Sequence, residues 1–372
     1  MANAVLVSSS FLPGRGGIES LLGELCSELA PRVAVLAAAE RDGQPLPSDR
    51  GYPTVGFPGR LLAAGPRAFQ AIRAASERFE TTKVIFGTPW PLSLLGPRLK
   101  ESGFRYAVMV HGAELLVPAA IPFLRSRLAQ ALAGADLLLT VSQFTGGRLH
   151  SFLESRGGPP PIDVLYPRVD TKTFTPTVKS NLRARLGIGP ETKVLLCFGR
   201  LVPRKGVDRV INLMPRLAGD MDVVLVVAGT GPEEKKLRRQ ADRLGARVIF
   251  AGHVPYEDAP ALYALADVFV LAVADRWSGL DVEGLGVVLL EAASCATPCV
   301  TGRSGGTPEA VHHGKTGFVV DALDGLALFE AIQRLLLNVE EARAMGAAGR
   351  RFVIRRFARR ALPESLLGWL DD

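Results

Sequence analysis

Short apolar runs alternate with longer amphipathic stretches along the first half of the chain. The stretch 17–29 has the spacing of a helix, and a helix-like segment follows each later run. The apolar runs do not alternate with polar residues, which is typical of parallel strands that are covered on both faces. This succession predicts βαβ units and a doubly wound sheet. The predicted strands of this half are 4–8, 33–38, 83–87, 107–111 and 136–141.

The alternation stops over residues 157–180, which are rich in Pro, Gly and Thr and lack helical periodicity. It then restarts, which predicts a second doubly wound sheet and an α/β protein of two domains. We expect domains at 1–168 and 181–352, joined by a linker at 169–180. A C-terminal helix at 353–372 is expected to return to the first domain. The predicted strands of the second half are 193–198, 222–228, 247–251, 268–271, 299–301 and 317–320.

The composition is that of a globular protein. Of the 372 residues, 48% are hydrophobic and 22% are charged, which excludes a disordered or fibrous chain. Four cysteines are too few for a disulfide framework. The first residues lack the basic segment of a signal peptide, and no charge-free apolar run reaches the roughly 18 residues that span a bilayer. We therefore expect a cytoplasmic protein whose contact with a membrane is peripheral.

The net charge is mildly positive. Basic residues exceed acidic residues by 44 to 37, which gives +7 at pH 7. The excess is spread over both halves of the chain, which argues against a nucleic-acid partner. An anionic small molecule or an anionic membrane surface fits such an excess better.

A glycine-rich loop follows the first predicted strand and opens the first predicted helix. It contains Gly16 and Gly17, and adjacent glycines let a ligand approach the backbone. The free N–H groups at the start of the helix favour an anion. The loop departs from the G-x-G-x-x-G pattern of dinucleotide sites. It is therefore either a phosphate-binding loop or a tight turn.

Three cations follow the first predicted strand of the second half, at Arg200, Arg204 and Lys205. In open α/β sheets, ligands bind at the carboxyl ends of the strands. Arginine offers a forked donor and lysine a point charge, which together suit a diphosphate. An exposed basic loop is the alternative, and the clustering favours the diphosphate site.

Two carboxylates bracket the start of a buried helix in the second half. The apolar run 287–290 predicts that this helix begins near Gly286, with its first N–H groups directed toward the carboxyl edge of the sheet. Glu283 precedes the helix and Glu291 lies inside it, where a carboxylate is costly unless it accepts hydrogen bonds. Sugar hydroxyls are suitable donors. The alternative is a helix-capping role for Glu283 and a salt bridge for Glu291.

Three further motifs carry weaker signals. His111 ends a predicted strand and is either structural or catalytic. The loop 304–309 is either a second phosphate cradle or the simple start of a helix. Asp220 and Asp222 have the acid-x-acid spacing of a divalent-metal site, but they precede their strand and so lie at the wrong edge of the sheet. The sequence therefore predicts no metal site.

Residues 57–79 of the first domain combine apolar and basic side chains in the manner of a segment that lies on a membrane. A second basic stretch, 350–360, contains six arginines in eleven residues and predicts an amphipathic helix. In both cases the alternative is a packed helix with solvated arginines. The candidate membrane-binding residues are Arg60, Leu61, Leu62, Arg67, Arg73 and Arg78.

Over nearly its whole length the chain resembles the retaining, two-domain glycosyltransferases of family 4. The Glu-x7-Glu pair Glu283 and Glu291, the cations Arg200 and Lys205, and the Gly-Gly loop at 16–17 carry this resemblance. The stretches GRLVPRKG, GLDVEGLG and SGGTPEAVHHGKTGFVVD are similar to those of actinobacterial phosphatidylinositol mannoside mannosyltransferases. The resemblance implies two Rossmann-like domains that face each other across a cleft, the GT-B architecture.

The same resemblance implies how the donor is bound. Arg200 and Lys205 would hold the donor diphosphate with Arg204 beside them, and Gly16 and Gly17 would close over the phosphates from the first domain.

The resemblance also implies contacts for the sugar and the nucleoside. Glu283 would contact the hydroxyls of the transferred sugar, His111 would lie at the reacting centre, and Glu291 would bind the ribose. The base would lie near 253–257, with Val254 among its contacts. The backbone N–H groups that would assist Glu283 are those of Gly284, Leu285, Gly286 and Val287.

The implied activity is the transfer of mannose, with retention, from GDP-mannose to a phosphatidylinositol mannoside-type glycolipid. No metal or other cofactor would be required. The implied partners are the nucleotide sugar and an anionic lipid surface at the inner face of the plasma membrane, and the oligomeric state stays open. One alternative is a GDP- or UDP-sugar transferase with a soluble or another lipid acceptor. A phosphorylase and a non-catalytic nucleotide-sugar binding module are further alternatives.

Overall fold

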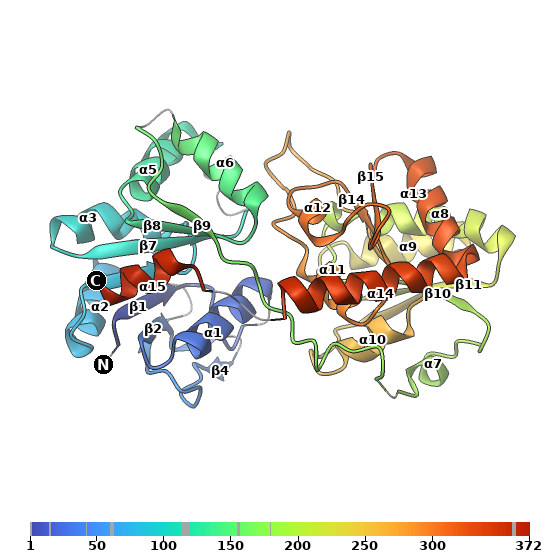
Figure 1. Ribbon diagram of the computed structural model, residues 1–372, viewed down its shortest axis with the longest axis horizontal. Helices are drawn as coiled ribbons and strands as arrows, with labels where there is room; N and C mark the ends of the chain where they lie inside the picture. The colour runs from blue at the N-terminus through green and yellow to red at the C-terminus, as the bar shows by residue number, and fades with distance from the viewer. Residues whose placement is uncertain are drawn as a thin grey trace. The chain divides into compact units, whose positions relative to one another are not determined.

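The chain folds into two compact α/β units, which are shown in the computed structural model of Figure 1. The structure describes residues 2–14, 16–41, 43–59, 63–112, 120–154, 157–178, 180–358 and 362–372. The first unit comprises Met1–Pro167 together with Ala361–Asp372, and the second comprises Arg168–Arg360. Each unit is described by itself below.

The first unit is built on a parallel sheet whose strand order, within the described residues, is β5-β2-β1-β6-β7-β8-β9. Every residue of β1 and β2 is buried, as expected for strands that are covered on both faces. The short strands Glu40–Arg41 (β3) and Gln44–Pro45 (β4) form a separate antiparallel pair. The sheet strands are Ala4–Ser8 (β1), Val33–Ala38 (β2), Thr54–Phe57 (β5), Lys83–Phe86 (β6), Arg105–Val110 (β7), Leu137–Thr140 (β8) and Ile162–Val164 (β9).

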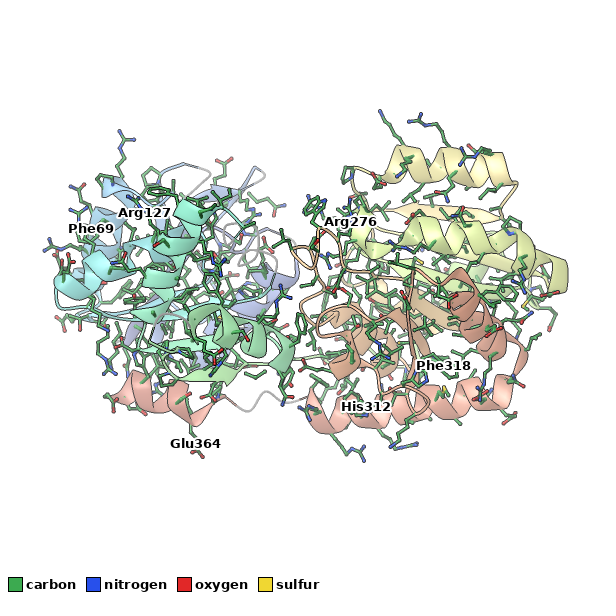
Figure 2. All side chains as sticks on the ribbon, turned by 90° about the horizontal axis from the view of Figure 1, so that it is seen from above. Phe69, Arg127, Arg276, His312, Phe318 and Glu364 are labelled. Carbon is green, nitrogen blue, oxygen red and sulfur yellow. The ribbon has the colours of Figure 1, made fainter. Side chains whose placement is uncertain are left out.

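Helices cover both faces of this sheet. Val5 and Val7 of β1 contact the core that holds Phe69 and its neighbours, whereas Ala4 and Leu6 face the opposite core. Figure 2 shows Phe69 and the terminal helix with Glu364 on opposite sides of the unit. The helices are Gly17–Leu29 (α1), Pro66–Arg78 (α2), Leu92–Leu95 (η1), Gly96–Glu101 (α3), Pro122–Ala133 (α5), Gln143–Glu154 (α6) and Glu364–Asp371 (α15).

The second unit repeats the doubly wound design. Its parallel sheet has the order β12-β11-β10-β13-β14-β15. Helices α8, α9 and α13 pack on one face, and Tyr263 of α10 meets Phe198 and Phe269 on the other. The strands are Lys193–Phe198 (β10), Val223–Ala228 (β11), Val248–Gly252 (β12), Val268–Leu271 (β13), Cys299–Gly302 (β14) and Gly317–Val320 (β15). The helices are Leu182–Arg185 (α7), Pro203–Lys205 (η2), Val207–Asp220 (α8), Glu234–Leu244 (α9), Ala259–Leu265 (α10), Val287–Ser294 (α11), Thr307–Ala310 (α12), Gly325–Leu337 (α13) and Val339–Arg356 (α14).

The structure confirms the predicted α/β class with two doubly wound sheets. Every predicted strand is present, and those at 33–38, 193–198 and 317–320 coincide with β2, β10 and β15. The sequence pattern missed β5 and β9, because both are short, half-buried strands at the edges of the sheet and carry little apolar signal.

Residues 169–180, predicted as a linker, belong to the second unit as far as they are described. Val169 donates its N–H to the carbonyl of Phe357. Phe174 is buried against Tyr263, and its carbonyl accepts a hydrogen bond from Ser294 Oγ at 2.7 Å. Apolar burial and backbone hydrogen bonds therefore tie this stretch to one unit, where the Pro-rich composition predicted only a connection.

The predicted boundary of the C-terminal helix at 353 lies too early. Helix α14 continues to Arg356 with Phe352 and Val353 buried in the second unit, and Ile354 is 44% exposed. The separate helix α15 packs on the first unit (Figure 1), where Asn3 donates a hydrogen bond to the carbonyl of Leu370. The predicted return of a C-terminal helix to the first domain is thus confirmed for α15. Within the described residues, no helix has both the length and the apolar character needed to cross a bilayer.

Candidate active site

The strand order of the second unit creates a switch point beside β10. From β10 the chain proceeds to β11 on one side, whereas β13 lies on the other side and leads to β14 and β15. Loops that leave the carboxyl ends of β10 and β13 diverge there, which is where open α/β sheets bind ligands. The loop after β10 carries Arg200, Arg204 and Lys205, and the loop after β13 carries Glu283. The structure thus places these predicted residues at one edge of one sheet.

Four charged side chains from these two loops form a compact cluster. Lys205 Nζ lies 2.8 Å from Oε2 of Glu283, and Arg204 Nη1 contacts the same oxygen. Arg204 Nε lies 2.8 Å from Oδ1 of Asp281. The four side chains are between 11% and 20% exposed, so the charges are largely shielded from water. Two cations and two carboxylates balance, and we call this set the charge cluster.

The charge cluster keeps Glu283 ionised. Burial alone would raise the pKa of this carboxyl, but the charges and hydrogen bonds of Lys205 and Arg204 outweigh burial and lower it below its ordinary value. Glu283 is therefore an acceptor for hydroxyl donors at neutral pH and is no source of a proton.

Arg200 differs from its two basic neighbours because it is exposed and makes no ion pair with any residue that the structure describes. It lines a small hollow with Lys205, Phe198 and Leu271 at the ends of β10 and β13. Gly206 follows Lys205 with a φ of 70°, which favours glycine, and a Cβ there would overlap the Ala272 carbonyl oxygen. A cation with its head in solvent beside a half-buried lysine is available to an anionic ligand.

The start of α11 forms the other wall of the site. Gly286 is the N-cap residue, and no side chain among the described residues caps this end of the helix. In the first turn, Leu289 donates its N–H to the Gly286 carbonyl at 2.9 Å, so the N–H groups available to an anion or a sugar oxygen are those of Val287 and Val288. Gly284 and Leu285 link this turn to Glu283. The predicted helix start is confirmed.

Residues 304–306, the first part of the loop 304–309 that the sequence offered as a second phosphate cradle or as the start of a helix, hold the backbone of Glu283. Ser304 Oγ accepts from the Glu283 N–H at 3.2 Å, and Gly306 donates its N–H to the Glu283 carbonyl at 3.0 Å. A Cβ on Gly305 would overlap the Glu283 carbonyl oxygen, and one on Gly306 would overlap that of Gly284. These residues therefore position a predicted site residue, a role that sequence reasoning did not assign.

Glu291 is held by a residue that sequence reasoning missed. The hydroxyl of Tyr263 donates to Glu291 Oε2 at 2.7 Å. Tyr263 is fully buried among Phe174, Phe198 and Phe269, and burial, followed by the Glu291 charge, raises its pKa well above the ordinary value. The sequence did carry a signal for this contact, a tyrosine on an otherwise apolar helix, because a buried phenol needs a hydrogen-bond partner.

The segment predicted to lie near a base follows β12, at the same edge of the sheet. Val254 is half-buried there, whereas His253, Glu257 and Asp258 are exposed. β12 is the edge strand, and β11 lies between it and β10. This segment is therefore separated from the charge cluster along the carboxyl edge of the sheet.

The remaining predicted site residues lie in the first unit. His111 follows β7 and is 8% exposed, and its Nε2 donates to the carbonyl of Gly87 at 2.8 Å. A carbonyl only accepts hydrogen bonds, so Nε2 carries a hydrogen. Gly16 is the N-cap of α1, and Gly17 has open space where a Cβ would stand. Both segments leave carboxyl ends of sheet strands.

The basic face predicted for membrane contact is present where it is described. Arg67, Arg73 and Arg78 of α2 are exposed, while Phe69 and Ile72 on the same helix are buried. Arg73 pairs with Glu77 at 3.6 Å, one turn away. The other predicted members, Arg60, Leu61 and Leu62, lie outside the described residues.

The acid-x-acid pair at the opposite edge is engaged in other contacts. Asp222 accepts from Thr192 and Arg247 at 2.6 Å each, and Asp220 accepts from Gln333. In the described part of the chain, no group of three or more His, Cys, Asp or Glu side chains is placed to hold a metal ion.

Solved structures with this architecture are glycosyltransferases of the GT-B class. The fold matches that of sucrose-phosphate synthase from Thermosynechococcus elongatus with a TM-score of 0.78 and 21% identity, covering 95% of this chain and 94% of that chain. It matches WaaG, a glycosyltransferase involved in lipopolysaccharide biosynthesis, with a TM-score of 0.74 and 18% identity over 98% and 99% of the two chains. The fold is therefore GT-B.

The family follows from sequence comparisons. Residues 15–173 match Glycosyltransferase Family 4, and residues 178–352 match Glycosyl transferases group 1. The chain is 38% identical over 363 residues to the GDP-mannose-dependent alpha-(1-6)-phosphatidylinositol monomannoside mannosyltransferase of Mycolicibacterium smegmatis, covering 94% of this chain and 93% of the relative. It is 34% identical to the GDP-mannose-dependent monoacylated alpha-(1-6)-phosphatidylinositol monomannoside mannosyltransferase of Corynebacterium glutamicum, covering 99% of this chain and 97% of the relative. The chain belongs to the glycosyltransferase family 4 and is a hexosyltransferase.

Proposed function

We propose that this enzyme transfers mannose from GDP-mannose to a phosphatidylinositol mannoside-type glycolipid at the cytoplasmic face of the membrane. Transfer proceeds with retention and without a metal ion. The observation that carries the proposal is the 38% identity, over 94% of the chain, to a relative named for this reaction. The charge cluster and the open start of α11 supply the chemistry that such a transfer needs.

Cations in the loop that follows the carboxyl end of β10 bind the donor diphosphate. As the bond between the sugar C1 and the phosphate oxygen breaks, negative charge grows on the leaving nucleoside diphosphate. Arg200, Lys205 and the first N–H groups of α11 stabilise that charge, and preorganised donors of this kind contribute strongly to catalysis. The acceptor oxygen bonds to C1 from the same face, and its proton passes to the leaving phosphate.

Acidic side chains orient the donor on either side of the diphosphate. The ionised Glu283 accepts hydrogen bonds from the mannose hydroxyls, assisted by the backbone of Gly284 and Leu285. Glu291 accepts from the ribose hydroxyls, in the orientation fixed by Tyr263. His111 is assigned to the transferred sugar, and its Nε2 donates to the carbonyl of Gly87.

Contact with the membrane comes from the first domain. Arg67, Arg73 and Arg78 form an exposed basic face on α2. A cation near an anionic lipid surface contributes about 1 kcal/mol at moderate ionic strength. This face brings the enzyme to its lipid acceptor.

A transfer assay tests the proposal. Purified enzyme is incubated with labelled GDP-mannose or UDP-glucose and with phosphatidylinositol monomannoside in anionic vesicles, with and without EDTA. We expect a lipid product that bears one further mannose. It should form with GDP-mannose and not with UDP-glucose, and its rate of formation should be the same with and without EDTA. Transfer only from the UDP-sugar, or only to a soluble acceptor, would overturn the donor or acceptor assignment. Loss of activity in EDTA would overturn metal independence.

A further inference from the structure

The two cations that touch Glu283 are not equivalent. Lys205 Nζ pairs with Glu283, and among the described residues it has no second carboxylate within ion-pair distance. Arg204 contacts Glu283 through Nη1, and its Nε forms an ion pair of 2.8 Å with Oδ1 of Asp281 that does not have the geometry of a hydrogen bond. The guanidinium of Arg204 therefore bridges two carboxylates, whereas the ammonium of Lys205 also lines the hollow beside Arg200.

The backbone holds Asp281 firmly in place. Asp281 and Arg276 (labelled in Figure 2) form an isolated bridge, with N···O distances of 3.0 and 3.2 Å. The intervening turn places Trp277, Ser278 and Gly279 at φ values of 50°, 53° and 82°. Two successive non-glycine residues in this conformation are strained, and such strain persists where the surroundings determine the turn closely. The turn fixes the carboxylate that in turn fixes Arg204.

We propose that Arg204 is a positioning residue rather than a ligand of the donor diphosphate. Tethered by Asp281, it holds Glu283 against the transferred sugar, and Lys205 is the cation that shifts from Glu283 to the diphosphate when the donor binds. This inference rests on the proposed function in two respects, the contact between Glu283 and the sugar and the binding of the diphosphate by Lys205.

The balance of charge in the cluster supports this division of roles. If both cations moved to the diphosphate, Glu283 and Asp281 would remain as buried carboxylates without a counter-charge, which is strongly unfavourable. If only Lys205 moves, Arg204 still neutralises Glu283. The planar fork of arginine can serve two carboxylates at once, whereas a lysine at this position would be a single point charge.

The variant Asp281→Asn separates this role from direct phosphate binding. Removing a carboxylate beside the site makes it more positive, so a phosphate-binding Arg204 would be freed and GDP and GDP-mannose would both bind more tightly. A positioning Arg204 would instead lose its tether. Affinity for GDP would then stay within about twofold, GDP-mannose would lose its advantage over GDP, and kcat would fall on the order of 10- to 100-fold.

The experiment measures the affinities for GDP and GDP-mannose by calorimetry, together with kcat and KM. The variants are Asp281→Asn, Arg204→Lys, Lys205→Gln and the double variant of the first two. We expect Arg204→Lys to reproduce Asp281→Asn, and the double variant to be no worse than either, because both break one linkage. Lys205→Gln should weaken the binding of GDP by about tenfold or more. Asp275→Asn, an exposed acid of the same loop, is the charge-matched control and should leave all values unchanged.

Two results would overturn the inference, and two further measurements serve as controls. Equal weakening of GDP by Arg204→Lys and Lys205→Gln, or a normal kcat in Asp281→Asn, would overturn the inference. The same measurements are made with UDP and UDP-glucose. Tighter binding of the uridine nucleotides would overturn the proposed donor, and the variants could still be compared with one another on those ligands. If GDP alone still raises the melting temperature of Asp281→Asn, the variant is folded.

Discussion

The phenol of Tyr263 donates a hydrogen bond of 2.7 Å to Glu291 Oε2 from within a fully buried aromatic cluster. Tyr263 lies on α10 and Glu291 on α11, so this contact fixes one carboxylate of the Glu-x7-Glu pair between two helices. The other carboxylate, Glu283, is fixed by ion pairs from the loop after β10. A neutral hydroxyl holds one acid and two cations hold the other, which gives the two acids distinct responses to mutation.

Replacing Tyr263 by Phe removes the donor to Glu291 and keeps the aromatic packing. We expect a loss of about 1 kcal/mol in the free energy of unfolding. We also expect the rise in melting temperature on adding GDP to shrink, because Glu291 loses its orientation. Tyr106→Phe is the matched control, since Tyr106 is also buried and donates to the carbonyl of Ala131 in the other unit. It should lower stability similarly and leave the GDP-induced shift intact. An equal loss of that shift in both variants would contradict the role of Tyr263.

Replacing Arg200 by Ala tests the exposed cation. Since Arg200 makes no ion pair with a described residue, we expect an unchanged melting temperature. Turnover should fall on the order of 10²- to 10³-fold, the usual cost of losing a donor that stabilises developing charge. Arg239→Ala, at an exposed position of α9, should retain full activity. Near-native turnover of Arg200→Ala would remove it from the diphosphate site.

The stability of the charge cluster should depend on pH with a defined sign. The folded-state pKa of Glu283 lies below its ordinary value of 4.5, so its stabilising contribution is fully present above about pH 4.5 and is lost as the pH falls through the folded-state pKa. The difference in unfolding free energy between the wild type and Glu283→Gln should be constant from pH 8 to 5 and should shrink below 4.5. Chemical denaturation at several pH values measures this difference. A difference that grows on acidification would mean that the folded-state pKa is raised.

Gly306→Ala tests whether the loop 304–306 positions Glu283. The φ of Gly306 is −82°, which alanine adopts freely, so the substitution acts only through the overlap of its Cβ with the Gly284 carbonyl. We expect a displaced Glu283 and a kcat lower by about 10-fold or more. Gly219→Ala, with open space around an exposed position near the end of α8, should be fully active and no less stable. Equal activity of the two variants would show that the loop does not position Glu283.

The basic face of α2 should set the affinity for anionic vesicles. Changing Arg67, Arg73 and Arg78 together to Gln removes three exposed cations and leaves the buried face intact. At about 1 kcal/mol each, the three cations contribute about 3 kcal/mol, so binding should weaken on the order of 100-fold at low salt. Vesicle sedimentation measures this, with neutral vesicles as the reference. The same change at Arg238, Arg239 and Arg243 of α9 is the matched control. Equal losses from both triple variants would point to net charge rather than to this face.

Much of the fold could be predicted because its signals are local. The apolar runs within 33–38 and 193–198 favour strands that are covered on both faces, and these ranges coincide with β2 and β10. Gly286 before the run 287–290 marked the start of α11. The rule that ligands meet the carboxyl ends of parallel strands then placed Lys205 and Glu283 at one edge, although 78 positions separate them.

Tertiary structure alone decided which side chains within the site hold one another. The sequence presented Arg204 as one more phosphate ligand, and only the folded loops show it bridging Asp281 and Glu283. Sequence patterns likewise could not show that the loop 304–306 clamps Glu283 or that Tyr263 supports Glu291. Local patterns record burial and backbone preference residue by residue. An ion pair depends instead on how far two loops approach and on which partner compensates each buried charge, and these properties exist only once the chain has packed.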